Sequence, residues 1–243
     1  MSSAQPDTDR TAGGLPIGRL VAPTLLTPAP RPGPVSLRAR NVIVDRPDVA
    51  RDAEILFKAS HGPEREALWL YMGVGPFADV AGFRAWLEQR LADADPYFYA
   101  LRDPATGVAL GLASLMRIDP ANHVVEVGNI LYSPGLQRSV AATEAMYLLA
   151  RYVFDLGYRR YEWKCNAHNL PSRRAAERLG FVFEGIFRQH MIIKGRNRDT
   201  AWFAILDRDW PAIRRGFEAW LEPNNFDAQG QQRRGLAALR AGG

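Results

Sequence analysis

The order of segments between Glu126 and Gly185 is the feature that most constrains the fold of this chain. Strand and helix patterns alternate there, over residues 123–132, 141–156, 160–166 and 171–179. Each helical pattern stops at a glycine, Gly157 or Gly180. Glycine is common just past a helix because it adopts a left-handed backbone at no steric cost. This alternation is typical of an α/β domain.

The flanking segments extend the same domain. Residues 35–44 alternate as a strand does, and Asp48 is a candidate N-cap for a helix that ends near Ser60. Further elements are expected as a helix at 83–91, strands at 97–102 and 108–117, a hairpin of 181–193 with 199–206, and a helix at 210–221. We therefore predict an α/β domain with a mixed sheet.

The two ends of the chain have a different composition. Residues 1–34 hold seven of the 17 prolines and show no helical or alternating period, which favours an extended arm. Residues 223–243 are expected to form a flexible tail, although Leu236, Leu239 and Arg240 have the spacing of a short helix. The folded domain is accordingly expected over residues 35–222.

Composition excludes several classes of protein. The 243 residues include one cysteine, Cys165, so an intrachain disulfide and a thiolate metal cluster are excluded. No apolar run reaches the ~20 residues that span a bilayer. We expect no secretory leader, a cytoplasmic protein and no membrane partner. The net charge of +5 comes from scattered arginines, so we expect no nucleic-acid partner. The four histidines show no ligand spacing, and no metal site is expected.

Two polar residues mark the start of the second helix. Asn169 and Ser172 are three residues apart, with Pro171 between them at a position that suits a first helical turn. One interpretation is that Asn169 or Ser172 simply caps the helix. The other is that the free N–H groups of this helix end bind an anionic ligand.

Taken together, these motifs resemble those of the GNAT family of acyl-CoA-dependent N-acyltransferases, in its RimJ/RimL-like branch. The resemblance covers residues 35–205. Its strand pattern Glu-x-Gly-x-x-Leu corresponds to Glu126, Gly128 and Leu131. Its pyrophosphate-binding turn corresponds to residues 137–142, and its later Asn-x-x-Ser and Gly-Phe elements correspond to Asn169, Ser172, Gly180 and Phe181.

The resemblance implies a fold and a set of site residues. The fold would be a mixed, mostly antiparallel sheet flanked by helices, with two strands splayed apart at the acyl-CoA site. Acetyl-CoA would be the co-substrate, and no metal would be needed. The expected cofactor-binding residues are Ile130, Leu131, Tyr132, Gln137, Arg138, Ser139, Val140, Ala141, Ala142, Thr143, Asn169 and Ser172. The expected catalytic residues are Ser172, as hydrogen-bond or proton donor to the leaving thiolate, and Glu126, as general base.

Two positions depart from the family pattern. Val140 stands where the turn usually has a glycine, and Ala176 stands where many members have a tyrosine that protonates the thiolate. Either the turn needs no positive φ at Val140 or cofactor binding is weakened. Ser172 is then the hydroxyl left for the thiolate.

The general base has several candidates. The alternatives to Glu126 in that role are His190, His123 and a chain of water molecules, and pairing of Glu126 with an arginine is an equally good interpretation. Glu162 and Lys164, on the neighbouring strand, can pair or touch substrate. Cys165 is expected to be a small core residue.

The expected function is transfer of an acetyl group from acetyl-CoA to a primary amine, with a protein N-terminal α-amine as the favoured acceptor. The alternatives are a small-amine acceptor, a succinyl donor, or an acyl-CoA-binding module without catalysis. The acceptor would enter over residues 61–83, where glycines alternate with aromatic residues. The resemblance also makes a homodimer an expected assembly.

Overall fold

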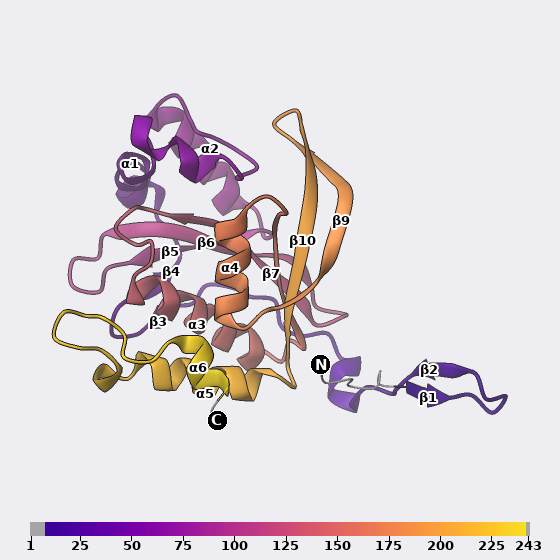
Figure 1. The fold of residues 1–243 in the computed structure, drawn as a ribbon. Coiled ribbons are helices and arrows are strands. Elements are labelled where there is room, and N and C mark those ends of the chain that lie inside the picture. The colour runs from indigo at the N-terminus through magenta and orange to yellow at the C-terminus, as the bar shows by residue number, and fades with distance from the viewer. Residues whose placement is uncertain (1–7, 242–243) are drawn as a thin grey trace.

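The computed structural model describes residues 8–241, and its centre is an eight-stranded sheet (Figure 1). The strands lie in the order β3-β4-β5-β6-β7-β8-β10-β9. Their bounds are β3 Leu37–Arg38, β4 Ile43–Asp45, β5 Tyr97–Arg102, β6 Ala109–Asp119, β7 Val124–Tyr132, β8 Arg160–Asn166, β9 Val182–Ile193 and β10 Arg196–Leu206. Only β7 and β8 pair in parallel. The mixed, mostly antiparallel sheet is therefore confirmed.

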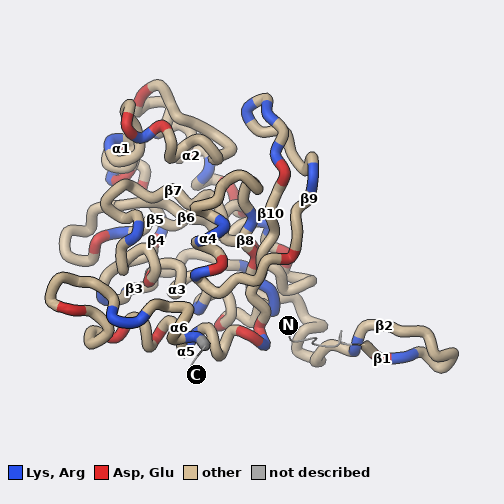
Figure 2. The backbone as a smooth tube through the Cα atoms, in the orientation of Figure 1, with Lys and Arg blue, Asp and Glu red and all other residues tan. Residues whose placement is uncertain are grey.

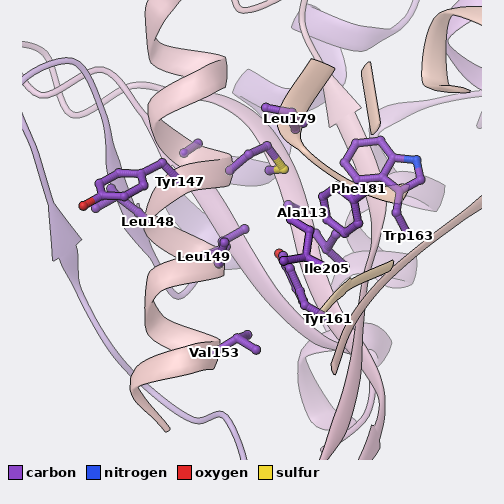
Figure 3. Close-up of a cluster of buried hydrophobic side chains, with 14 of the residues drawn as sticks. Ala113, Tyr147, Leu148, Leu149, Val153, Tyr161, Trp163, Leu179, Phe181 and Ile205 are labelled. Atoms are coloured by element: carbon purple, nitrogen blue, oxygen red, sulfur yellow. The ribbon is translucent and has the colours of Figure 1, made fainter. Parts of the chain in front are cut away.

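Helices cover both faces of the sheet. Their bounds are α1 Val49–Ser60, α2 Val80–Ala92, α3 Val140–Asp155, α4 Leu170–Leu179, α5 Trp210–Leu221 and α6 Leu236–Ala241. One core lies under α1 and α2 and includes Leu56 and Phe83. The larger core lies under α3, α4 and α5, where Leu149, Leu179 and Phe181 pack against the sheet (Figure 3). Burial of these apolar side chains is the main term that holds the layers together.

Most expected elements form close to their predicted bounds, and the caps explain why. Asp48 caps α1 by accepting a hydrogen bond from the Arg51 N–H, as predicted. Gly180 ends α4 in the left-handed conformation. The single strand predicted over 35–44 was wrong. The chain turns there, with the Ala39 N–H bonded to the Val42 carbonyl, and forms the short hairpin β3–β4 instead.

Strands β7 and β8 separate part-way along their length. They pair only from Val124 with Arg160 to Val127 with Trp163, although both continue for several residues. Beyond that point β7 bulges: Asn129 has a φ of 50° and its side chain donates to the Ser114 Oγ at 2.9 Å. A bulge bends its strand and adds local twist. The splayed pair predicted from the sequence is thus present, and this separation is the β7–β8 gap.

The N-terminal residues reach away from the sheet. Strands β1 (Thr8–Arg10) and β2 (Pro16–Gly18) form a small hairpin that projects from the body (Figure 1). A 3₁₀ turn at Pro23–Leu26 follows. The segment then joins the body, where the Ala29 N–H bonds to the Pro120 carbonyl and the Gly33 N–H to the Tyr152 hydroxyl.

The C-terminal residues pack onto the domain. A short 3₁₀ turn at Pro223–Asn225 leads to a loop that Asn225 holds by hydrogen bonds to Trp220 and Arg234. Helix α6 follows, and its Leu236 is 1% exposed within the larger core. The short helix expected here is present, and the structure packs it where a flexible tail was expected. No helix within residues 8–241 is long and apolar enough to cross a membrane.

Candidate active site

The N-terminus of α3 forms one wall of the candidate site. Ser139 is its N-cap, and its Oγ accepts a hydrogen bond from the Ala142 N–H at 3.0 Å. The first N–H groups of a helix have no acceptor in a preceding turn, so those of Val140 and Ala141 point out of the helix end. Together with the positive end of the helix dipole, they form a site that suits a phosphate.

Val140, which stands where the family pattern has a glycine, does not strain the backbone of this turn. Val140 is the first residue of α3, and the positive φ of the turn, 58°, belongs to Arg138. Val140 is not among the described residues with a positive φ. Of the two explanations left open by the sequence, the structure supports the first: the turn does not need glycine at this position.

Helix α4 begins on the other side of the β7–β8 gap. Asn169 is its N-cap, with Oδ1 accepting from the Ser172 N–H at 3.1 Å, so the capping interpretation is confirmed. The Asn169 amide nitrogen donates no hydrogen bond to the part of the chain the structure describes. The Ser172 Oγ accepts a hydrogen bond from Trp163 Nε1 at 3.0 Å. The hydroxyl also interacts with the Cys165 thiol, so its own hydrogen is shared between that sulfur and a further acceptor.

On α4, Ala176 stands where the family pattern usually has a tyrosine hydroxyl. Ala176 is fully buried in the larger hydrophobic cluster and offers no polar group. Cys165 is also buried there, as predicted, and burial raises the pKa of its thiol. A protonated, buried thiol is a poor nucleophile.

Glu126 lies on the opposite face of the sheet, in a group of charged side chains. Its side chain is 6% exposed, and Oε2 is 3.1 Å from Lys164 Nζ and 3.3 Å from Arg117 Nε. Lys164 Nζ is also 2.6 Å from Glu162 Oε2 and lies 3.7 Å from the centre of the Trp202 ring. The pairing of Glu126 with an arginine, one of the sequence interpretations, is therefore present.

This environment sets the protonation of Glu126. Burial raises the pKa of its carboxyl, because a charged group loses hydration inside the protein, while Lys164 and Arg117 act in the opposite direction. The pKa of Glu162 is lowered, because Lys164 and Arg160 together outweigh its desolvation. Glu126 is thus the carboxylate of this group that takes up a proton more readily.

Two histidines were alternative candidates for the general base, and the structure places them in different environments. Both ring nitrogens of His123 are 2.9 Å from backbone carbonyls, those of Gly157 and Thr27, so His123 fastens the N-terminal segment and has no free nitrogen. His190 lies beside the charged group, with Nδ1 3.0 Å from the Thr200 Oγ1. Partial burial lowers the pKa of its imidazole, and the nearby cations act in the same direction. His190 therefore remains a second candidate for the base.

The loop between α1 and α2 closes over this face of the sheet. Trp69 is fully buried, Lys194 of the β9–β10 hairpin donates to its carbonyl at 2.8 Å, and the Tyr71 hydroxyl donates to the His168 carbonyl at 3.2 Å. These bonds connect the loop to the hairpin and to the start of α4. A hollow of about 600 Å³ in the loop, with His61 and Phe77 in its wall, contains none of the predicted site residues.

The predicted catalytic residues therefore lie on opposite faces of the sheet, beside the last paired residues of β7 and β8. Side chains alternate along a strand: Trp163, which holds Ser172, faces the larger core, and Lys164, which pairs with Glu126, faces the other way. The structure does not bring Glu126 and Ser172 into contact. It places them on opposite faces of the sheet where β7 and β8 begin to separate, an arrangement that suits an amine entering from one face and a thioester held from the other.

Two residues of the site were not predicted from the sequence. Arg117 reaches Glu126 from β6, and Arg198 lies near it at the start of β10. Arg117 has a φ of 47° beside an irregular register between β6 and β7, and Arg198 precedes a register shift between β9 and β10. No short motif marks either position, because both depend on which strands pair and where.

Comparison with known proteins agrees with this geometry. The acetyltransferase (GNAT) domain family matches residues 42–182. The crystal structure of a GCN5-related N-acetyltransferase from Brucella melitensis is 49% identical, with a TM-score of 0.86 over 88% of this chain and 98% of that one. Among curated proteins, an uncharacterized N-acetyltransferase, p20, of Bacillus licheniformis is 28% identical over 163 residues, 65% of this chain and 89% of its own.

A further relative carries a more specific name. The ribosomal-protein-serine acetyltransferase of Escherichia coli is 28% identical over 99 residues, which is 40% of this chain and 55% of its own length. This similarity is consistent with the RimJ/RimL-like branch. The match over residues 42–182, the splayed β7–β8 pair and the capped turn before α3 agree, and the chain belongs to the GNAT family of N-acetyltransferases.

Proposed function

We propose that this enzyme transfers an acetyl group directly from acetyl-CoA to a primary amine, with a protein N-terminal α-amine as the favoured acceptor. The β7–β8 gap is the single observation that carries the proposal. It leaves backbone N–H groups of β7 near Ile130 and Tyr132 without partners on β8, and such groups stabilise the oxyanion that forms on a thioester carbonyl.

The proposed binding of acetyl-CoA depends on the N-termini of α3 and α4. The amides of Val140 and Ala141 and the side chains of Gln137 and Arg138 would hold the pyrophosphate, with Ser139 keeping the turn in shape. The rest of the expected set, Leu131, Ala142, Thr143 and Asn169, would line the path of the pantetheine arm.

In the proposed reaction, Glu126 and Ser172 each have one role. Glu126 accepts a proton from the incoming ammonium, because only the neutral amine attacks. The amine nitrogen forms its bond to the acetyl carbon and gives up its second proton to solvent, the carbon–sulfur bond then breaks, and the sulfur leaves with the bonding pair as a thiolate, which solvent protonates. Ser172 donates a hydrogen bond to that thiolate while Trp163 Nε1 holds its oxygen in place.

The acceptor class is supported by the name of the Escherichia coli relative, which acts on a ribosomal protein. We also propose that the enzyme is cytoplasmic, in line with its one unpaired cysteine. A homodimer belongs to the proposal as well, because the edge strand β9 exposes Val182, Ile186, Phe187 and Ile192.

The test has two steps. Isothermal titration measures binding of acetyl-CoA, and a thiol-release assay then measures turnover with peptides that have free or blocked N-termini, with small amines, and with succinyl-CoA as donor. We expect binding, and thiol release that depends on a free peptide amine. Binding without release from any amine would show a non-catalytic acyl-CoA-binding module, and absence of binding would refute the proposal.

A further inference from the structure

Arg198 is half-buried, and no described carboxylate forms an ion pair with its guanidinium. Its Nε donates to the Thr200 Oγ1 at 3.2 Å, and it forms no ion pair within residues 8–241. Burial lowers the pKa of its guanidinium, Cys165 and Glu126 act in the opposite direction, and Arg117 adds to the effect of burial. The half-buried Arg160, by contrast, pairs with both Glu162 and Glu184. A partly desolvated arginine without a carboxylate is costly unless something binds it.

Arg198 lies on the side of the sheet where the acceptor would enter. The neighbouring β10 residues Thr200 and Trp202 pair with Asn166 and Lys164 of β8, which places them on the face that carries Glu126. Arg198 interacts electrostatically with Glu126 and also with Cys165, whose side chain lies on the other face of β8, so Arg198 lies near the opening between β7 and β8. Glu126 does not pair with Arg198, however, because its closest cations are Lys164 and Arg117.

The balance of charge on this side of the molecule is positive. The β9–β10 hairpin, residues 182–206, includes four Lys or Arg side chains and two carboxylates, Glu184 and Asp199. Lysine and arginine residues gather along the outer half of the β9–β10 hairpin (Figure 2). A small acceptor whose only charge is its ammonium group would be repelled by this hairpin, whereas an acceptor with a nearby anionic group would be attracted.

We propose that the acceptor carries a carboxylate close to its reacting amine, and that Arg198 binds this carboxylate. The inference rests on the proposed acetyl transfer. A guanidinium group fits a carboxylate through two parallel hydrogen bonds, and Arg198 has its terminal nitrogens free for them, since only its Nε is bonded. The carboxylate could come from an Asp or Glu side chain near a peptide N-terminus, or from the α-carboxylate of a free amino acid.

The experiment compares matched acceptors. Thiol release is measured with C-terminally amidated peptides that begin with Asp or with Asn and are otherwise identical, and with free amino acids against their amides. We expect the carboxylate-bearing member of one pair to have a kcat/KM about 10- to 100-fold higher, the range for a hydrogen-bonded charge. The peptide and amino-acid arms distinguish the two sources of the carboxylate.

Three variants assign the effect to Arg198. R198Q should collapse the preference between the paired acceptors, and R198K should keep part of it because the charge remains. R196Q removes one long-range charge from the exposed turn of the same hairpin and should leave most of the preference, because only Arg198 would contact the carboxylate. Acetyl-CoA titration of each variant checks that its fold is intact. Equal rates for the paired acceptors with the unaltered enzyme, or an unchanged preference in R198Q, would overturn the inference.

A binding measurement separates this inference from the proposed function. Binding of the Asp and Asn peptides to the CoA complex is measured by titration, with and without R198Q. Tighter binding of the Asp peptide that R198Q abolishes, in the absence of thiol release from any amine, would support the carboxylate site and refute the acetyl transfer. Thiol release at equal rates from the paired acceptors would support the acetyl transfer and refute the carboxylate site.

Discussion

Glu126 shows how a single residue gains its chemistry from its surroundings. Its carboxyl is buried enough for its pKa to rise, yet Lys164 and Arg117 keep the ionised form accessible. A general base must be able to exist without its proton and still accept one during the reaction. Neither neighbour lies beside Glu126 in the sequence, so strand pairing creates this balance.

Replacing Glu126 tests that role. We expect E126Q to lower kcat about 10²- to 10⁴-fold, the usual contribution of general base catalysis. Because the base works only when deprotonated, kcat of the unaltered enzyme should fall as pH drops through the raised pKa, above the ordinary glutamate value of 4.5. The pH profile of kcat measures both. E184Q, at the exposed end of the same ion-pair network, serves as control, and wild-type kcat in E126Q would shift the role to His190 or water.

Ser172 gives a second prediction at the level of one atom. S172A removes the hydroxyl proposed to stabilise the thiolate and leaves Trp163 Nε1 without its acceptor. We expect kcat to fall about 10²-fold while the Kd of acetyl-CoA changes little, because the hydroxyl acts on charge that develops during the reaction. S172T keeps a hydroxyl and should retain most of the rate. An S172A enzyme with unchanged kcat would reject the assignment.

The elements place these residues, and the turn before α3 is a testable example. Ser139 caps the helix and stands at the proposed phosphate site. S139A should cost about 1 kcal/mol of unfolding free energy, the usual value of an N-cap. S139D restores a cap but adds a negative charge. It should therefore keep stability and still weaken acetyl-CoA binding. Urea unfolding and titration measure the two effects, and unchanged affinity in S139D would contradict a phosphate site here.

The bulge in β7 gives a prediction about the gap itself. Asn129 holds a left-handed backbone, which a β-branched residue adopts only with strain of about 1 to 3 kcal/mol. N129V should therefore lose that much stability and bind acetyl-CoA more weakly, since relief of the strain would disturb the separation of β7 from β8. N129G keeps the backbone conformation and should bind acetyl-CoA normally. Equal affinity in both variants would show that the bulge does not shape the site.

Elements with strong local signals were predictable, and elements set by tertiary contacts were not. Strand β8 formed over the predicted residues, because Gly157 follows the helix before it and Asn169 caps the helix after it. The 3₁₀ segment Pro63–Trp69 was not foreseen. It is held by the Trp69 indole, which donates to the Ser60 carbonyl within a cluster of aromatic rings.

The candidate site divides in the same way. Asn169, Ser172 and the turn at residues 137–142 carry a pattern that the sequence displays, and each occupies a helix start in the structure. Arg117 and Arg198 reach the site through irregular strand pairing, which no window of sequence encodes. The charged group around Glu126 was therefore predicted only in part, through Glu162 and Lys164.

On the scale of the whole molecule, the C-terminal residues close the larger core. Leu236 is 1% exposed and packs among residues of α4 and α5. L236A should lower the free energy of unfolding by about 2 to 5 kcal/mol, the range for truncating a buried leucine. L26A, at a leucine that is 75% exposed in the N-terminal segment, should change it by less than about 0.5 kcal/mol. Equal stabilities in urea would mean that α6 contributes nothing to the fold.

The central claim is that donor and acceptor meet in the β7–β8 gap and react without a covalent enzyme intermediate. Cys165 is buried and protonated, and the Ser172 hydroxyl is held by Trp163, so neither is an activated nucleophile. The most direct test is the initial rate of thiol release with acetyl-CoA and a peptide amine both varied. Direct transfer predicts intersecting double-reciprocal lines. Parallel lines, which mean that CoA leaves before the amine binds, would contradict it.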